Sequence, residues 1–145
     1  MNILVALDLS PSSQEIVKQV EELFNLPHVK FWLLHVADPE PEFIGYADGP
    51  QYIRDAVAQE FHAEHKAIQA IATEMRNAQI DCTALLIQGY CPDTILSEAQ
   101  RLKAHLIVMG SHGKNMMKQL ILGSTSQAVI QDSKIPVLVI PTKTN

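Results

Sequence analysis

Five short apolar runs alternate along this chain with longer amphipathic stretches, and that alternation constrains the fold more than any other feature. The runs cover residues 3–7, 29–36, 80–87, 106–109 and 137–140 and are rich in β-branched and aliphatic side chains. Each run is nearly continuous in its hydrophobicity, which is typical of strands that are buried on both faces. The sequence therefore predicts an α/β fold in which a five-stranded parallel sheet is covered by helices on both sides.

Four helices are predicted between these strands. Ser10 and Pro11 suit the cap and the first position of the first helix. A long helix is expected over residues 51–77, a third helix has Pro92 in its first turn, and a fourth covers about 124–131. Apolar residues of the long helix fall near one stripe: Ile53, Val57, Phe61, Ile68, Ile71 and Met75.

The length of 145 residues fits a single domain over 1–145, and a hydrophobic content of 47% is enough to bury a core. Two cysteines, Cys82 and Cys91, are too few for a disulfide framework and fit a reducing cytosol. The N-terminal apolar run follows no basic segment and is too short for a signal-peptide core or a membrane span. We therefore expect a cytoplasmic protein without a membrane span.

The net charge of −5 argues against a general nucleic-acid binder, which would carry a basic surplus. The charge is uneven, because residues 1–72 hold 4 basic and 11 acidic residues whereas residues 73–145 hold 7 and 5. An anion would therefore bind more favourably to the second half of the chain.

The connection over residues 38–50 is long for a compact βαβ unit and holds three prolines, two glycines and four acidic residues. A lid over a crevice is one interpretation, and a plain surface excursion is the other.

Three of the six glycines follow the fourth predicted strand, at positions 110, 113 and 123. Gly110 ends that strand and Gly123 starts the fourth helix. At the carboxyl edge of a parallel sheet, glycines let backbone N–H groups approach an anion, and a helix start adds its positive dipole. Hydroxyl residues at 124–126 and the cations Lys114 and Lys118 make this region suited to a polyphosphate. A tight turn followed by an ordinary helix cap is the alternative.

Two better-known phosphate motifs are absent, since the sequence has no G-x-x-x-x-G-K-[ST] and no G-x-G-x-x-G after its first strand. The first strand leads instead to Asp8, whose carboxylate could accept hydrogen bonds from ribose hydroxyls or an adenine amino group. The alternative is an acid at a helix start that interacts with the dipole of the first helix.

The spaced pattern Gly110-x2-Gly113-x9-Gly123-Ser124 resembles the signature of the ATP-binding branch of the universal stress protein family. The segments ILVALDLSPSS, LIVMGSHG and IPVLVIP are similar to the first strand and loop, the fourth strand and phosphate loop, and the last strand of that family. The resemblance covers essentially the whole chain. It implies a Rossmann-like, open sheet of order 3-2-1-4-5, a homodimer joined through the last strand, and ATP bound between strands one and four.

Position by position, the resemblance implies that Asp8 faces adenine or ribose and that Val36 touches adenine through its backbone. Met109 and Gly110 would lie along the nucleoside, and the phosphates would lie against the glycines and hydroxyls that follow. The residues of this predicted nucleotide site are Asp8, Val36, Met109, Gly110, Ser111, His112, Gly113, Gly123, Ser124 and Thr125.

Two positions depart from the family pattern. Leu9 stands where the family often has Gly after the first-strand Asp, and this change is expected to narrow the loop. His105 stands where Asp is common before the fourth strand, a place from which little effect on the nucleotide is expected. Neither change removes a residue that would face phosphate.

Several other polar residues could bind a metal or act in catalysis. His62 and His65 could share one helix face as a metal pair, but a solvated face is the favoured interpretation. Ser111 and His112 are adjacent, yet no acid is placed to orient the imidazole of a nucleophilic triad. His35 is expected in the core, and Cys82 is expected to be inert. Cys91 precedes the third helix, whose dipole could lower the thiol pKa, although a structural role is favoured.

These observations predict an ATP-binding, nucleotide-dependent regulatory homodimer of the stress response that acts on an unknown protein partner. The alternative is an enzyme that uses the same site, a slow ATPase or a nucleotidyl-transferring protein. A dimer that has lost nucleotide binding is disfavoured by the intact signature. No carboxylate lies within or beside the signature to act as a base, so any hydrolysis is expected to be slow. Mg²⁺ or Mn²⁺ would be held through the phosphates.

Overall fold

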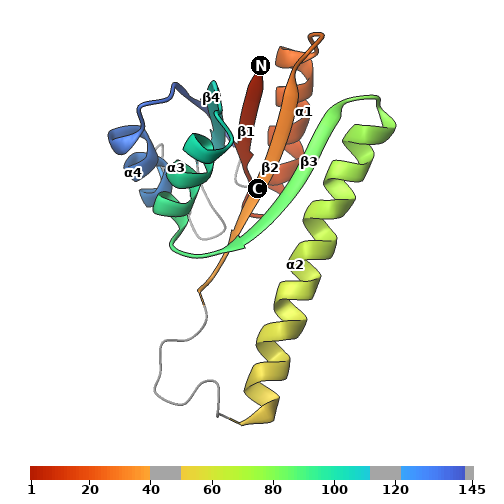
Figure 1. Cartoon of the computed structure of the whole chain (residues 1–145), viewed down its shortest axis with the longest axis vertical. Helices are drawn as coiled ribbons and strands as arrows, with labels where there is room; N and C mark the ends of the chain where they lie inside the picture. The colour runs from red at the N-terminus through yellow and green to blue at the C-terminus, as the bar shows by residue number, and fades with distance from the viewer. Residues whose placement is uncertain (40–49, 112–121, 143–145) are drawn as a thin grey trace.

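The computed structural model describes residues 1–39, 50–111 and 122–142. These residues form β1 (Asn2–Ala6), α1 (Ser12–Phe24), β2 (Lys30–Ala37), α2 (Gln51–Asn77), β3 (Asp81–Gln88), α3 (Cys91–Arg101), β4 (Leu106–Gly110), α4 (Ser124–Asp132) and β5 (Val137–Ile140). All strand pairs are parallel and follow the order β3-β2-β1-β4-β5 (Figure 1). The predicted α/β fold and its strand order are confirmed, and each predicted strand lies within one residue of its observed bounds.

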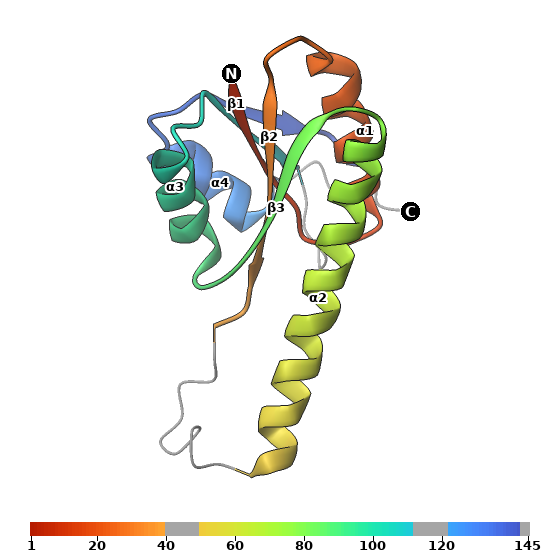
Figure 2. The same ribbon diagram turned by 45° about the vertical axis from the view of Figure 1, so that its right-hand side comes forward.

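Helices cover both faces of the sheet, α1 and α2 on one side and α3 and α4 on the other (Figure 2). The alternation of β1 explains this arrangement, because Ile3 and Val5 pack with the α1 and α2 residues whereas Leu4 packs with the α3 and α4 residues. All three side chains are fully buried. Each such burial stabilises the fold by roughly 2 kcal/mol, so the sheet is held from both sides.

The start of α1 differs from the prediction that Ser10 caps the helix with its side chain. No side-chain capping hydrogen bond is present there. Asp8 supplies the acceptor instead, because its Oδ1 accepts hydrogen bonds from the backbone N–H of Ser10 at 2.9 Å and the hydroxyl of Ser13 at 3.2 Å. The carboxylate therefore shapes the turn between β1 and α1.

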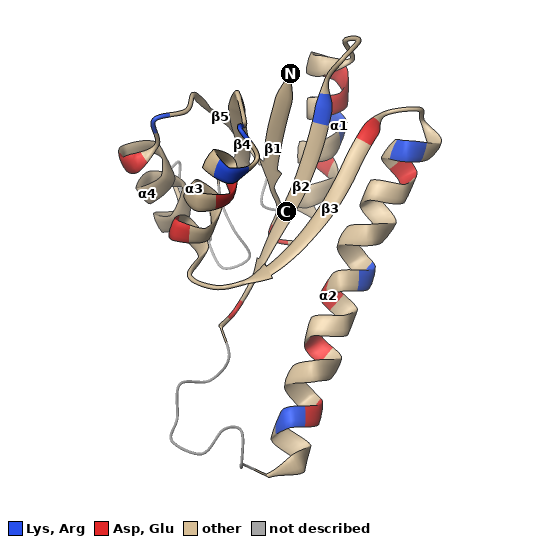
Figure 3. Cartoon of the chain, viewed as in Figure 1, with Lys and Arg blue, Asp and Glu red and all other residues tan. Residues whose placement is uncertain are grey.

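Only the second half of α2 packs on the sheet. Its buried residues are Ile68, Ile71, Ala72 and Met75. The earlier members of the same stripe, residues 53, 57 and 61, are only partly buried, and Tyr52 is 72% exposed. Figures 1 and 2 show the first half of α2 projecting beyond the sheet. Figure 3 shows charges of both signs along the helix.

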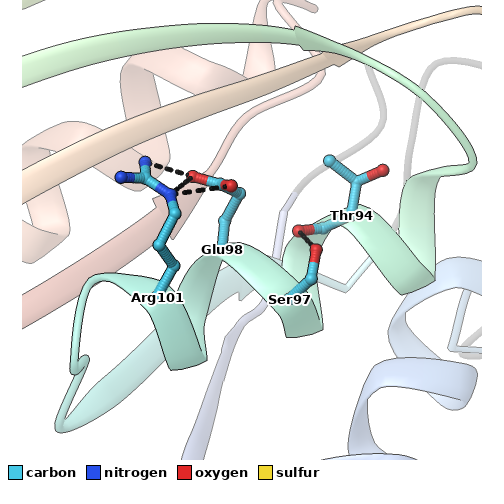
Figure 4. A network of polar contacts seen from close by, with 4 residues as sticks. All are labelled: Thr94, Ser97, Glu98 and Arg101. Atoms are coloured by element: carbon cyan, nitrogen blue, oxygen red, sulfur yellow. Dashed lines mark hydrogen bonds and ion pairs between the residues drawn. The ribbon is translucent and has the colours of Figure 1, made fainter.

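Two charged residues form an ion pair in the last turn of α3. Arg101 Nε donates to both carboxylate oxygens of Glu98, at 3.0 and 2.9 Å, and Ser97 donates to the carbonyl oxygen of Thr94 (Figure 4). The Arg101 side chain is 58% exposed and that of Glu98 is 13% exposed, so the pair lies where the solvated side of α3 meets its packed side.

β5 lies at one edge of the sheet and pairs with β4. Three of its four residues are partly exposed, and Ile140 is buried. Among the described residues, no helix is both long and apolar enough to span a membrane.

Candidate functional site

A cleft of about 410 Å³ opens at the carboxyl ends of the central strands; we call it the carboxyl-edge cleft. It lies where the strand order reverses around β1 and β4, which is the usual place for a ligand in an open α/β sheet. Seven of the predicted site residues line it: Asp8, Val36, Met109, Gly110, Gly123, Ser124 and Thr125. The structure therefore brings together residues that lie more than 100 positions apart in the sequence.

One carboxylate oxygen of Asp8 accepts hydrogen bonds from the turn before α1, and the other has no hydrogen-bond partner among the described residues. Oδ1 holds the turn into α1, as described above. Oδ2 is buried and has no hydrogen-bond partner in the described part of the chain. A buried carboxylate oxygen gains from a donor, so this atom suits a hydroxyl or amino group of a bound molecule. Oδ1 therefore has a structural role at the start of α1, and the contact of Asp8 with a bound nucleoside stays a prediction.

Leu9 adopts a left-handed backbone conformation, with φ of 58°. A residue with a Cβ is strained there by about 1 kcal/mol, whereas glycine is not. The conformation explains why Gly suits this position in the family pattern. The side chain of Leu9 packs partly buried against the core formed with α1 and α2, which offsets part of the strain.

The start of α4 faces the same cleft from the β4 side. Gly123 precedes the helix in an extended conformation, with φ of −61°, and no side-chain cap is present among the described residues. The first N–H groups of α4 can therefore meet an anion. Any residue adopts this φ, so backbone freedom does not explain the glycine at 123.

Two hydrogen bonds join the end of β4 to the start of α4. Gly123 N–H donates to the carbonyl oxygen of Ser111 at 2.9 Å, and the Ser126 hydroxyl donates to that of Gly110 at 3.0 Å. The Ser111 side chain is directed to Thr142, whose N–H donates to Ser111 Oγ at 3.1 Å. Ser111 is not among the residues that line the cleft.

The predicted site residues His112 and Gly113 lie outside the described residues, as do Lys114 and Lys118. The segment interpreted as a lid, over 38–50, also lies mostly outside them.

The described lining of the carboxyl-edge cleft is acidic. Asp8, Asp38 and Glu64 contribute carboxylates, and no Lys or Arg of the described residues lines it. Asp38 follows β2 and Glu64 belongs to α2, so the acids gather on the β1 and β2 side. The start of α4 lies on the β4 side. The cleft therefore has one side that suits hydrogen-bond donors and another that suits an anion.

His35 and Glu64 meet in the wall of this cleft. His35 is 5% exposed, and its Nδ1 lies 2.8 Å from the carbonyl oxygen of Leu7. Its Nε2 is 3.2 Å from Glu64 Oε1, although the contact does not meet hydrogen-bond geometry. The core position predicted for His35 is confirmed, and its contact with an acid from α2 is new.

Burial raises the pKa of both cysteines. The Cys82 thiol, in β3, rises from 9.0 to about 12, which fits the predicted inert residue. The Cys91 thiol lines the cleft, and burial raises its pKa while a hydrogen bond with Thr125 acts in the opposite direction. The expectation that the α3 dipole would lower the pKa of Cys91 is therefore wrong in direction, because desolvation is the larger effect.

His62 and His65 are both exposed, which confirms the predicted solvated face for these two residues. Among the described residues there is no group of three or more His, Cys, Asp or Glu side chains placed to hold a metal ion.

The sequence analysis missed Glu64 as a residue of the cleft, and a signal for it existed. Glu64 lies four residues before Ile68 and seven before Ile71, so it continues the buried stripe of α2. Its side chain is accordingly only 18% exposed. Asp38 could have been found from its place two residues after Val36, at the same strand end.

Two solved structures that share this fold contain a bound nucleotide. One is a universal stress protein in complex with cAMP, with a TM-score of 0.69 at 21% identity over 99% of this chain and 98% of that chain. The other is an Arabidopsis thaliana protein of the family with AMP bound, with a TM-score of 0.72 at 18% identity over 99% and 93%. At these identities the likeness shows the fold.

Closer similarity in sequence extends along nearly the whole chain. A sequence profile of the universal stress protein family matches residues 1–141. The universal stress protein A homolog 2 of Coxiella burnetii is 32% identical over 145 residues, which cover 97% of this chain and 94% of the relative. The solved structure of MJ0577 from Methanocaldococcus jannaschii has a TM-score of 0.82 at 28% identity and covers 99% of this chain and 97% of its own. The chain therefore belongs to the universal stress protein family.

Proposed function

We propose that this chain is an ATP-binding universal stress protein domain, over 1–145, that acts in the cytoplasm as a nucleotide-dependent regulatory homodimer. The observation that carries the proposal is the carboxyl-edge cleft, in which, among the described residues, Asp8 Oδ2 has no partner on one side and the start of α4 has no side-chain cap on the other. These two features match the two ends of a nucleotide, a nucleoside that donates hydrogen bonds and phosphates that accept them.

The lining of the cleft fits the nucleoside as well. Val36 and Met109 bring backbone and apolar surface beside Asp8. The nucleotides described in two proteins of the same fold, cAMP and AMP, support an adenine nucleotide as the ligand class. The choice of ATP rests on the pattern Gly110-x2-Gly113-x9-Gly123-Ser124, which resembles the signature of the ATP-binding branch of the family.

When bound, Mg²⁺ or Mn²⁺ would neutralise the phosphate charge. Phosphate oxygens and water would hold the ion, since Mg²⁺ keeps several waters in such sites. The described acids lie on the opposite side of the cleft from the start of α4, which favours this indirect mode.

A regulatory role is preferred over fast catalysis. Asp38 and Glu64 do line the cleft, but they belong to the β2 and α2 side and not to the glycine signature. A base must reach the water that attacks phosphorus, and no described carboxylate stands on the α4 side. Turnover should then be far below the roughly 10 per second of an ordinary enzyme. A slow ATPase or a nucleotidyl-transferring enzyme is the second candidate.

The direct test is to denature the purified protein and identify any released nucleotide by absorbance and mass spectrometry, with calorimetry of ATP binding and a phosphate-release assay. Released or titrated ATP with little phosphate supports the proposal. Failure to bind ATP, with or without Mg²⁺, would overturn it, and rapid phosphate release would favour the enzyme.

The homodimer is proposed to form through β5. An exposed strand edge tends to pair, and a two-fold mate would cover it with a self-complementary contact. Val139→Lys places a charge on that strand and should convert a dimer into a monomer in sedimentation velocity at micromolar concentration. A wild-type monomer, or a variant that remains dimeric, would contradict this part of the proposal. A protein partner would then recognise the nucleotide-bound dimer.

A further inference from the structure

A line of contacts runs from α2 to the residue that precedes Asp8. Glu64 Oε1 lies 3.2 Å from His35 Nε2, and His35 Nδ1 lies 2.8 Å from the carbonyl oxygen of Leu7. The N–H of Leu7 donates to the carbonyl oxygen of Leu34 at 2.9 Å. Both backbone polar groups of Leu7 are thus fixed by β2, and Asp8 follows immediately.

The tautomer of His35 is set by its neighbour. A carbonyl oxygen only accepts, so Nδ1 carries a hydrogen and donates it to Leu7. Nε2 then faces a carboxylate oxygen, and that contact is favourable only when one proton lies between the two atoms. Without this proton two lone pairs oppose each other inside a wall that is nearly closed to water, since the side chains are 7% and 18% exposed.

We infer that Glu64 is a positioning residue of the nucleotide site, which acts through His35 to hold the end of β1 where Asp8 presents Oδ2 to the nucleoside. The inference rests on the proposed nucleotide binding. It makes α2 a part of the site, although the glycine signature lies on β4 and α4. Glu64 need not touch the ligand for this role.

A purely electrostatic role for Glu64 would have the opposite sign. The carboxylate adds to the negative charge of Asp8 and Asp38 in the same cleft. Removing that charge should strengthen the binding of an anionic ligand such as ATP. Positioning instead predicts that removing the side chain weakens binding, so the direction of the change separates the two roles.

The variants to compare are Glu64→Ala, Glu64→Gln and Glu60→Ala. Glu64→Ala removes the contact with His35. Glu64→Gln removes the charge but lets the amide donate to Nε2 of a neutral imidazole, so it preserves the contact without the shared proton. Glu60→Ala is the matched control, because Glu60 is an exposed acid one turn earlier on α2.

Calorimetry measures the ATP affinity of wild type and of the three variants. We expect Glu64→Ala to bind about fivefold more weakly, the size of one lost polar contact. Glu64→Gln should bind at least as well as wild type, and Glu60→Ala should be unchanged. Thermal unfolding confirms that each variant is folded.

Equal or tighter ATP binding by Glu64→Ala would overturn the inference, as would an equal loss of affinity in Glu60→Ala or a loss in Glu64→Gln as large as that in Glu64→Ala. These results are distinct from a failure of the proposed function, in which wild type itself would not bind ATP.

Discussion

Clefts of nearly equal size lie at the two ends of the sheet, about 410 Å³ at the carboxyl edge and about 420 Å³ at the amino edge. The amino-edge cleft lies where α1 and α2 end and the chain turns into β2 and β3, and it is lined by Glu21, residues 24–31 and residues 79–81. The two clefts differ in the backbone groups that lie beside them. Helices start at the carboxyl-edge cleft, where their first N–H groups lie, and end at the amino-edge cleft, where their last carbonyl oxygens lie.

The polar groups of the amino-edge cleft are largely engaged. The N-terminal ammonium donates to the carbonyl oxygen of His28 at 2.6 Å, and Lys30 pairs with Asp81 at 3.6 Å. The N–H groups of residues 78–80 donate to the last carbonyl oxygens of α2. At the carboxyl edge, Asp8 Oδ2 and the start of α4 lack such partners among the described residues. The two clefts have similar volumes, so the direction of the chain, and not cavity volume, favours the carboxyl edge as the candidate site.

The largest expected effect is on ATP affinity when the carboxyl-edge cleft loses space. Gly123→Val keeps a φ that any residue adopts, so the variant should fold, but its side chain would occupy the place of the phosphates. ATP should bind at least tenfold more weakly, or about 1.4 kcal/mol, by calorimetry. Leu26→Ala alters the amino-edge cleft as the control and should leave affinity unchanged. Equal affinity in wild type and Gly123→Val would break the comparison.

The two cysteines should differ in how they affect stability at alkaline pH. The folded-state pKa of Cys82 is raised to about 12 from 9.0, so its contribution is fully present below pH 9 and is lost as the pH rises toward 12. The free energy of unfolding should fall through this thiol by at most about 1.4 kcal/mol per pH unit.

Urea unfolding of wild type, Cys82→Ala and Cys91→Ala between pH 8 and pH 11 would measure this slope. The slope should flatten more in Cys82→Ala, because a hydrogen bond with Thr125 opposes the shift at Cys91. Identical slopes in the two variants would contradict the burial argument.

A smaller effect on binding is expected from an isosteric change at Asp8. Asp8→Asn keeps an acceptor for Ser10 and Ser13 but replaces the partnerless Oδ2 by a donor if the amide turns that way. Adenosine, which carries no phosphate charge, should bind about fivefold more weakly by calorimetry. Asp81→Asn is the same change at the amino edge and should have no effect. A loss of affinity in both variants would contradict the placement of the nucleoside beside Asp8.

The smallest expected effect is on stability at the strained residue of the β1–α1 turn. Leu9→Gly should be more stable than Leu9→Ala by about 1 kcal/mol in urea, because Ala keeps the left-handed strain without the packing of Leu. Gln79, with φ of 64° at the amino edge, is the matched position. Glycine should exceed alanine there as well, with no change in ATP affinity. A more stable alanine variant at both positions would refute the strain argument.

The fold was accessible from the sequence because local signals and burial agree along most of the chain. Near-continuous apolar runs marked every strand, and the glycines at 110 and 123 pointed to the edge of the sheet where the carboxyl-edge cleft lies. The apolar stripe of α2 continues through residues 53, 57 and 61, which are only partly buried. Periodicity does not reveal where the sheet ends beneath a helix. The role of Glu64 depends on His35, a contact between elements that no local pattern encodes. The strain at Leu9 is likewise a property of the assembled turn.

The unequal division of α2 gives the molecule a mechanical property. Thirteen residues separate Glu64 from Gln51 at the helix start, a span of about 20 Å at 1.5 Å per residue. Glu64 lies one turn before Ile68, the first buried residue of α2, and so is near the boundary between the packed part of the helix and the projecting part. A tilt of roughly 5° about that point would move the far end by nearly 2 Å, given a stiff helix of this length. If a bound nucleotide tilted α2, the movement would be largest where the exposed Tyr52 lies.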